Sequence, residues 1–467
     1  MQIPILNGVY TNQSGDVRTA YPVNLAVVPK DSGVSDFYLR PFYGIVKIAD
    51  TNGIDRGGIN WLGVHYRVIG ESLCKVSEDG AISIIGTIAG SDNVILDYSF
   101  DYLGILADKR FYIYSPSTGI QEMTDTDLGD PIDFCWADGY FLFTDGESLI
   151  TNELNTPLSV LPFAYGSSEA APDPVKAVKN LLGEVMALNR YTIEYFNNIG
   201  GQFFPFQRID GARVLKGCVS TSACTYFSDS VAFVGGGKNE NLSVYIAGSS
   251  TATKISTQEI DLELNSLSEL DHEAILLESY TDNANEYLFV HLPTKTFVYD
   301  LGASQALQAP VWVSLSTSNT MTGVYRARNF VMCYGKIYCG DPFGNRLGIL
   351  SRDVASHYGD LISWQFSTQI IYNDSKGAQV HELELAALTG RNSLNDVAWI
   401  GTNYSLDGML WSQDRLIDAG LRGNRNQRLV WRKQGMMRNF RIQRFFGDSN
   451  SRLTFLRLEA QIEPLAR

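Results

Sequence analysis

The stretch Val64-His65-Tyr66-Arg67-Val68, followed by a turn near Gly70 and by Leu73-Cys74-Lys75-Val76, has the pattern of a β-hairpin. An apolar alternating run, a glycine or polar turn, and a second run rich in β-branched and aromatic residues predict two antiparallel strands. A repeated strand pair is the building unit of this chain, because the pattern recurs six more times. The further turns lie near Lys109, Asp145, Asn189, Gly236, Pro293 and Gly335.

The spacing of these turns predicts the fold class. The turn centres are 39, 36, 44, 47, 57 and 42 residues apart. The blades of β-propellers repeat at about 40 to 50 residues, because each blade is a four-stranded sheet. One such sheet cannot cover both of its faces, so neighbouring blades stack and bury each other. We therefore predict an all-β chain containing a β-propeller of six or seven blades.

The longest spacing contains a predicted helix. Ser256 and Glu259 have the spacing of a capping box, and apolar residues follow at helical spacing. We predict a short helix over residues 257 to 268, inserted between two blades.

The remaining segments complete the domain organisation that we predict. Residues 1–58 lack a hairpin of this type and are expected to form an extended N-terminal arm. Residues 59–350 are expected to form the propeller. Residues 351–467 return to strand patterns and are expected to form a basic C-terminal β region. The sequence leaves open whether this region completes the last blades or is a separate β module.

Composition excludes several classes of protein. The 467 residues are 45% apolar and 19% charged, with no heptad series and no apolar run near eighteen residues. Coiled coils and membrane-spanning helices are therefore excluded, and no membrane insertion is expected. The N-terminus lacks the basic and apolar regions of a secretory signal. Six cysteines without a C-x-x-C motif indicate buried reduced thiols, so synthesis in a reducing cytoplasm is expected.

Charge is distributed unevenly along the chain. The net charge is −14, but residues 411–467 hold 12 Lys and Arg against 5 Asp and Glu, a local charge of +7. The rest of the chain therefore carries −21. DNA binding depends on Lys and Arg displacing counterions from phosphates, so most of this chain would repel DNA. The asymmetry indicates a partner.

Motif searches predict no catalytic residues, no metal ligands and no cofactor. G-x-S-x-G, H-E-x-x-H, Walker and EF-hand motifs are absent from the sequence. Gly235-Gly236-Gly237 is interpreted as a hairpin turn, since the Lys-Ser/Thr pair of a phosphate loop is missing. Ser405-Leu406-Asp407-Gly408-Met409-Leu410-Trp411 resembles the Asp-box of sialidase-like propellers, shortened by one residue. That box stabilises a hairpin and has no catalytic role.

A basic strip near the C-terminus is interleaved with aromatic residues. It can pair with an acidic neighbouring subunit, form a solvated strand face or bind nucleic acid. We rank subunit pairing first, because the rest of the chain is acidic, and nucleic acid last. The interface candidates in the strip are Arg428, Trp431, Arg432, Arg438, Arg441 and Arg444.

Several ordered stretches resemble one protein family. They include Asp138-Gly139-Tyr140-Phe141, then Tyr191-Thr192-Ile193-Glu194-Tyr195-Phe196-Asn197-Asn198, then Phe203-Phe204-Pro205-Phe206-Gln207-Arg208. The pattern continues through Val298-Tyr299-Asp300 to Arg428-Leu429-Val430-Trp431-Arg432. The set resembles the packaged-DNA stabilisation (tail hub) proteins of short-tailed bacteriophages, from residue 36 onward. The shortened Asp-box departs from the family pattern.

The resemblance implies a structural virion protein of a phage tail without enzymatic activity. Such hubs form a homo-oligomeric ring, a hexamer, below the portal and its adaptor ring. They retain packaged DNA together with a tail needle, and they carry tailspikes or fibres until genome ejection. DNA is expected to pass through the ring without specific binding. Within the family motifs, Phe204, Phe206 and Arg208 are further interface candidates, although Phe204 and Phe206 can equally pack a loop on a blade.

The alternative function is a glycan-degrading or carbohydrate-binding propeller of the sialidase or depolymerase kind. Such an enzyme would hold paired carboxylates about 5 to 10 Å apart. An arginine cluster with paired carboxylates in the central funnel would favour it.

Overall fold

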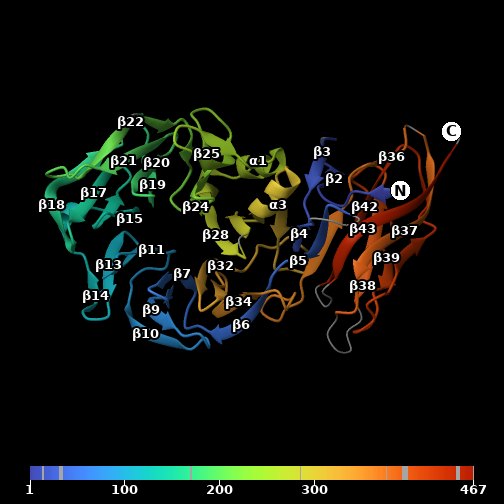
Figure 1. Cartoon of the computed structure of the whole chain (residues 1–467), viewed down its shortest axis with the longest axis horizontal. Helices are drawn as coiled ribbons and strands as arrows, with labels where there is room; N and C mark the ends of the chain where they lie inside the picture. The colour runs from blue at the N-terminus through green and yellow to red at the C-terminus, as the bar shows by residue number, and fades with distance from the viewer. Residues whose placement is uncertain are drawn as a thin grey trace. The chain divides into compact units, whose positions relative to one another are not determined.

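The computed structural model of the chain is built mainly of strands (Figure 1). It describes residues 1–467 except 13–14, 31–34, 169–170, 284, 375, 392–397, 449–452 and 466–467. Two compact units divide the chain. One contains residues 47–293 and 326–349, and the other contains residues 1–46, 294–325 and 350–467.

Seven antiparallel sheets follow one another along the described part of residues 44–351, and we number them as blades. Blade 1 contains β7 (Asp55–Trp61), β8 (Val64–Ile69), β9 (Ser72–Val76) and β10 (Ile82–Thr87), and blade 2 contains β11 (Ile95–Tyr98), β12 (Leu103–Ala107), β13 (Arg110–Ser115) and β14 (Gly119–Glu122). Blade 3 contains β15 (Asp133–Ala137), β16 (Tyr140–Thr144), β17 (Ser148–Glu153) and β18 (Thr156–Ser167), and blade 4 contains β19 (Val175–Leu181), β20 (Glu184–Asn189), β21 (Ile193–Asn198) and β22 (Phe206–Val214).

Blade 5 has five strands, and blades 6 and 7 have four each. Blade 5 has the order β23 (Gly217–Cys218), β25 (Ser230–Gly236), β26 (Ser243–Ala247) and β27 (Ala252–Lys254), with β24 (Cys224–Phe227) on β25. Blade 6 has the order β28 (Leu276–Asp282), β29 (Asn285–His291), β30 (Thr296–Asp300) and β31 (Trp312–Leu315), and blade 7 the order β32 (Arg328–Cys333), β33 (Lys336–Gly340), β34 (Arg346–Ser351) and β6 (Gly44–Asp50).

The first strands of the blades close a ring within residues 47–293 and 326–349. Strand β7 contacts β11, β11 contacts β15, and β15 contacts β19. Strand β19 contacts blade 5, whose β24 contacts β28; β28 contacts β32, and β32 returns to β7. The ring is seen end-on in Figure 1. The predicted all-β propeller is confirmed, and all seven predicted hairpins fall on strands that are neighbours in the sheet order.

Apolar side chains of neighbouring blades fill the space between them. Between blades 2 and 3, the ring centroid of Phe111 lies 5.0 Å from that of Phe134 and 4.7 Å from that of Phe143. All three side chains are buried. Edge-to-face aromatic pairs of this kind add stability beyond the area that they bury. The blades therefore hold each other, as the repeat predicts.

The other unit contains a β-sandwich. One sheet has the order β4 (Leu25–Pro29), β5 (Phe37–Pro41), β43 (Thr454–Pro464), β37 (Ala378–Leu388) and β40 (Leu429–Arg432), with β1 (Gln2–Ile3) on β43 and β41 (Met436–Met437) on β37. The second has the order β35 (Ser363–Ser367), β42 (Phe440–Asp448), β38 (Trp399–Ser405) and β39 (Arg415–Asp418), with β36 (Ile371–Tyr372) on β42. β2 (Gly8–Thr11) and β3 (Val17–Ala20) form a hairpin.

Aromatic residues from both sheets form the sandwich core. Phe455 of the first sheet lies 4.7 Å from Trp364 and 5.2 Å from Phe366 of the second, between ring centroids. Trp431 and Phe445 make a similar pair at 5.5 Å. The strands after residue 351 pair with one another and with β1 and β5, so they form a separate β module in the sheet topology. The domain boundaries at residues 58 and 350 stay a prediction.

Residues 1–58 contain regular strands where an extended arm is predicted. β1, β4 and β5 join the sandwich, while β6 pairs with β34 in blade 7. β4 pairs locally with β5, whereas β1 and β6 pair with strands far away in sequence. Strand β1, for example, pairs with β43, Gln2 facing Glu459.

The predicted helix between blades is present with a different cap. It runs as α1 (Gln258–Asn265) and α2 (Glu269–His272). The Ser256 hydroxyl instead donates to Asp261 at 2.6 Å and accepts from a β26 amide, so the capping box predicted with Glu259 is wrong. A capping box forms at Ser268 and Asp271, at the start of α2. A further helix, α3 (Leu301–Leu307), and a 3-10 turn (Thr126–Leu128) are not predicted from the sequence.

The glycine triplet is a close-approach site more than a turn. Gly235 and Gly236 are strand residues of β25, and Gly237 begins the turn. A side chain on Gly235 would collide with the carbonyl group of Gly217, which pairs across the sheet with Gly236. The predicted turn is therefore wrong for two of the three glycines, because two backbones must pass close together.

Candidate assembly interface

The basic strip splits into three groups in the sandwich. The first group lies on β40, an edge strand beside β37. The Arg428 guanidinium donates to both carboxylate oxygens of Glu384, at 2.8 and 2.6 Å, and Arg432 donates to Glu382 at 3.3 Å. Both arginines are exposed. Surface pairs of this kind contribute little stability, so these two residues remain available to a partner.

The second group is buried and holds the sandwich together. Arg441 lies 3.8 Å above the ring of Tyr404 and donates to the Gln434 carbonyl at 2.6 Å. Burial lowers the pKa of Arg441 to about 10. Trp431 is buried and donates to the Arg415 carbonyl at 3.1 Å. These two predicted interface residues are inaccessible to a neighbouring subunit in this fold, because their alternation along the strands points them into the core.

Arg444 is partly buried, between the exposed first group and the buried second group. Its guanidinium lies 4.0 Å from the ring of Trp411 and donates to Asn403 at 2.9 Å. Trp411 belongs to the shortened Asp-box, whose turn is built as the motif predicts. Asp407 accepts the amides of Met409 and Leu410, both at 2.8 Å, and Ser405 accepts the amide of Gly408 at 2.7 Å. Arg444 therefore stabilises this hairpin.

The third group consists of exposed cations that form no ion pair within the described part of the chain. We call them the free cations: Arg422, Arg425, Lys433 and Arg438. Leu421 is exposed beside Arg422, at the end of β37 where Gly423 bonds Gly390, and Met436 is exposed near the other end of β37, where it pairs with Gln379. Of the six strip candidates, Arg428, Arg432 and Arg438 are thus accessible, and their role at an interface stays a prediction.

The family-motif candidates lie on blade 4. Phe206 is buried and packs against Tyr140 of blade 3, with 6.0 Å between ring centroids. Phe204 is half-buried beside Phe206 and fills the space above Gly166 of β18. Arg208 is exposed, 3.6 Å from the buried carboxylate of Glu194. Both phenylalanines therefore pack a loop on a blade, which leaves Arg208 accessible.

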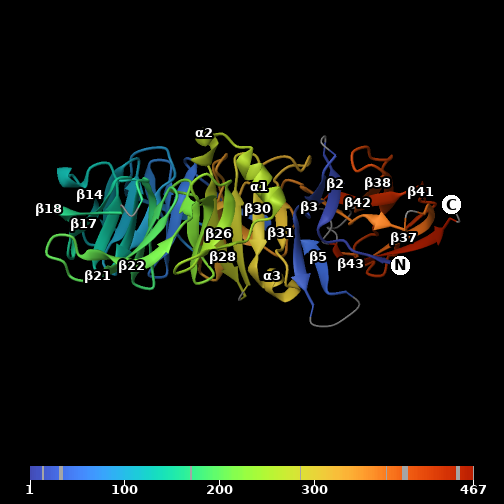
Figure 2. The same cartoon turned by 90° about the horizontal axis from the view of Figure 1, so that it is seen from above.

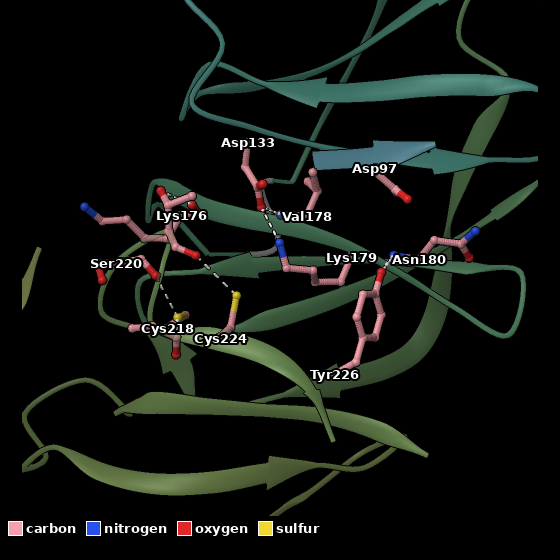
Figure 3. A network of polar contacts seen from close by, with 12 residues as sticks. Asp97, Asp133, Lys176, Val178, Lys179, Asn180, Cys218, Ser220, Cys224 and Tyr226 are labelled. Carbon is pink, nitrogen blue, oxygen red and sulfur yellow. Dashed lines mark hydrogen bonds and ion pairs between the residues drawn. The ribbon is translucent and has the colours of Figure 1, made fainter. Parts of the chain in front are cut away.

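A buried polar network joins blades 3, 4 and 5 (Figure 3). The Lys179 ammonium of β19 donates to Asp133 of β15 at 3.0 Å, and the same carboxylate accepts the Val178 amide at 2.8 Å. The Tyr226 hydroxyl accepts the Asn180 amide at 3.1 Å. Burial raises the pKa of Asp133 against the effect of Lys179. Burial alone would lower the pKa of Lys179, but Asp133 outweighs it and raises that pKa.

Comparable bonds connect every pair of neighbouring blades near the turn between the first and second strands. The bonded residues lie at similar sequence distances from the turn between the first and second strands of their own blade. These seven turns, which we call the first turns, therefore lie at one end of the ring. The linked pairs, from blade 1 around to blade 7 and back, are Trp61–Ser99, Asp97–Trp136, Asn180–Trp136, Asn180–Tyr226, Ser279–Tyr226, Glu278–Asn329 and Asn60–Met332.

Most cysteine and histidine side chains are buried in the core. The six cysteines are buried, and burial raises the pKa of Cys218. His65 and His357 are buried, and burial lowers their pKa values to about 2 and about 3. Among the described residues, no three His, Cys, Asp or Glu side chains converge as metal ligands would. These groups serve packing, so the chemistry of the chain lies in its surfaces.

Family comparisons match both units. The family model described as Bacteriophage P22 Gp10, beta-propeller, matches residues 1–355. The model described as Bacteriophage P22 Gp10, beta-sandwich, matches residues 363–463. The chain belongs to the P22 Gp10 family.

A curated relative matches this P22 Gp10 family chain over nearly its whole length. The tail hub protein gp10 of Salmonella phage P22 is 26% identical over 460 residues, 94% of either protein. The resemblance to tail hub proteins is thereby confirmed. It supports a structural tail hub role, and the glycan-processing alternative is not favoured.

Solved structures similar to the P22 Gp10 family chain include the N-terminal domain of Nup159 and the WD40 domain of Neurospora crassa Pan2. The first is 10% identical, covers 70% of this chain and 99% of its own, and has a TM-score of 0.42. The second is 9% identical, covers 64% of this chain and 90% of its own, and has a TM-score of 0.40.

The sequence analysis of this P22 Gp10 family chain missed the inter-blade network. Asp133 and Lys179 are 46 residues apart, and they lie in β15 and β19, two strands that the sequence analysis did not predict. The signal in the sequence is a charged residue beside apolar neighbours, Asp133 before Phe134 and Lys179 after Val178. Such a charge needs a partner, but the sequence does not name the partner.

Proposed function

We propose that this chain is the tail hub of a short-tailed bacteriophage. Six copies form a ring that closes the channel of the portal and its adaptor ring and retains the packaged DNA. The ring anchors the tail needle and the tailspikes or fibres until the genome is ejected. The observation that carries the proposal is the match of both the propeller and the sandwich to the P22 Gp10 family.

The physical properties of the chain support an architectural role. A closed ring of stacked blades gives each copy a rigid body, because every blade is bonded to both of its neighbours. Permanent assemblies bury interfaces above about 2,000 Å². The exposed cations of the sandwich and the acidic remainder of the chain supply surfaces for such contacts.

The acidic charge suits a protein beside a DNA channel. Residues 1–410 carry −21, and a surface of this sign repels phosphates. We expect the genome to pass the ring without specific binding. No helix among the described residues has the length and apolarity needed to cross a bilayer.

The retention role is tested with particles that lack the chain. A nonsense codon in its gene is expected to yield heads that package DNA and then lose it, measured as a fall in nuclease-resistant DNA per particle. Adding the folded chain to freshly filled heads should restore retention, whereas heat-unfolded chain should not. Infectious, DNA-filled particles without the chain would refute this role.

The ring itself is tested by electron microscopy of the restored particles. We expect sixfold density below the adaptor, with needle and tailspikes absent from particles that lack the chain. Needle and tailspikes bound in its absence would contradict the anchoring role. Turnover of host surface polysaccharide by the purified chain would support the glycan-processing alternative instead.

A further inference from the structure

The outermost strand of blade 3 leaves its sheet in the middle. β17 and β18 pair at Ile150 with Tyr165 and at Asn152 with Val160. Four residues of β18, 161–164, therefore lie opposite Thr151 alone. A bulge of this kind redirects side chains, and here it turns apolar residues away from the blade.

The bulge creates an exposed apolar surface. Leu161, Phe163 and Tyr165 are exposed, Phe163 by 69%. The ring of Phe203, in the β21–β22 loop of blade 4, lies against Phe163 with 6.4 Å between centroids. Phe163 has a φ of 69°, a left-handed conformation that is rare for bulky residues. A fold does not need a strained, solvated phenylalanine, so a binding role is the better account.

A groove beside this surface combines apolar walls with carboxylates. Its volume is about 250 Å³, and its apolar lining includes Val160, Leu161 and Phe163. Asp127 and Asp145 also line it. Asp145 caps the following turn by accepting the amides of Glu147 and Ser148. The Asp127 carboxylate is exposed and has no partner among the described residues. An arginine or lysine fits such a groove, because its stem is apolar and its head is cationic.

We propose that this groove docks Arg422 and Arg425, two of the free cations, from the sandwich of a second copy. The proposal rests on the hub ring of the proposed function and names the two surfaces that would meet in it. Arg422 and Arg425, in the β39–β40 loop, would supply the cations, and Leu421 of the same loop the apolar contact.

Charge favours a second copy as the occupant. The C-terminal 57 residues carry +7, and the groove belongs to the part of the chain that carries −21. Arginine and aromatic residues are the usual anchors of protein interfaces. The two surfaces differ from each other, so the contact is head-to-tail, and head-to-tail contacts generate a ring when the rotation between copies closes.

Two variants, each with one of the two proposed surfaces disabled, test the contact in solution. Leu161→Lys/Phe163→Lys disables the groove, and Arg422→Glu/Arg425→Glu disables the cations. Each variant alone should self-associate at least about tenfold more weakly than the wild type in sedimentation velocity. Mixed, they should form a one-to-one pair, since each retains the surface that the other lacks. Wild-type assembly by either variant, or no pairing in the mixture, would overturn the proposal.

Matched controls separate docking from general damage. Ile84→Lys changes an exposed apolar residue on an outer strand of blade 1, and Lys75→Glu/Lys238→Glu changes exposed cations outside the sandwich. Both should assemble as the wild type does. If the groove variant has a lowered Tm, Asp127→Lys replaces it, because that side chain makes no bond within the described structure.

Crosslinking in assembled particles covers the case in which the free chain is monomeric. A photoreactive residue at position 163, in particles built from equal amounts of light and heavy isotope-labelled chain, should crosslink to residues 415–438 in mixed-isotope pairs. A photoreactive residue at position 84, exposed on β10 of blade 1, serves as the control. Crosslinks from position 163 to another virion protein would overturn the proposal while leaving the hub function intact. Loss of the wild-type ring itself would instead contradict the hub function.

Discussion

At the scale of single residues, burial decides which charged groups build the fold and which meet partners. Asp133 is buried and Lys179 nearly so, whereas Arg428 and Arg432 stand at the surface. Removing one member of a buried pair leaves an uncompensated charge. Substituting a charged residue is therefore expected to cost much stability in the core and little at the surface.

Asp133→Ala should lower the free energy of unfolding by about 3 to 5 kcal/mol, because the Lys179 ammonium is left in the core. The double variant Asp133→Asn/Lys179→Met should recover most of this loss. Urea denaturation monitored by tryptophan fluorescence measures both. Arg432→Ala is the surface control, expected to change the stability by less than about 1 kcal/mol. Equal losses in the Asp133 and Arg432 variants would contradict the assignment.

His357 predicts a pH dependence of stability. Burial lowers its pKa from the usual 6.5 to about 3, and its Nδ1 lies 2.8 Å from the Thr317 hydroxyl. Below pH 6.5 the unfolded chain binds a proton that the folded chain does not bind, so stability falls as the pH falls towards 3. His357→Gln should reduce this slope by up to about 1.4 kcal/mol per pH unit. Denaturation series at pH 4, 5 and 7 measure it, and an unchanged slope would refute the prediction.

At the scale of elements, the hairpin turns show where the backbone preference of a residue and the packing between strands disagree. The turn between the first and second strands contains a non-glycine residue at positive φ in six blades. Asp, Ser or Asn occupies this position in three of them and Tyr334 in a fourth. In blades 1 and 4 the residue is a leucine, Leu62 and Leu182. Both leucines are exposed, Leu182 by 93%. Asparagine and aspartate adopt this conformation at lower cost, because their short side chains hydrogen-bond locally. The hairpins therefore form despite these residues, which shows that cross-strand packing sets their register.

Leu182→Asn should raise the stability by about 1 kcal/mol, since φ at this position is 54° and Gly183 follows at 89°. Differential scanning calorimetry measures the gain in Tm. Leu62→Asn should act in the same direction. Leu188→Asn, at a buried strand position of the same blade, should be strongly destabilising. A lower Tm for Leu182→Asn would mean that the leucine contributes packing in solution.

At the scale of the whole molecule, charge is divided between the two ends of the chain. The overall charge of −14 predicts no measurable binding of double-stranded DNA at 150 mM salt. Fluorescence anisotropy with a labelled duplex tests this, with dissociation constants above about 10⁻⁴ M expected. Micromolar binding by the wild type would exclude an acidic conduit.

The sequence predicted the repeated parts of this protein well. The hairpins around Gly70, Lys109 and Asp145 were readable because alternation and turn residues act within about ten positions. The Asp-box turn at Ser405 was readable for the same reason, since Asp407 bonds amides two and three residues away. The strands of residues 1–58 were missed, because β1 and β6 pair with partners hundreds of residues distant.

Tertiary structure alone decided which residues of the candidate site are accessible. Arg441 and Arg438 look alike in the sequence, but one packs on Tyr404 in the core and the other is exposed. The bulge of β18, which exposes Phe163, depends on its register against β17. The sequence by itself determined the class of fold and the family, because periodicity and ordered motifs are local properties. The surfaces came from the folded chain only, because burial depends on which distant strands lie side by side.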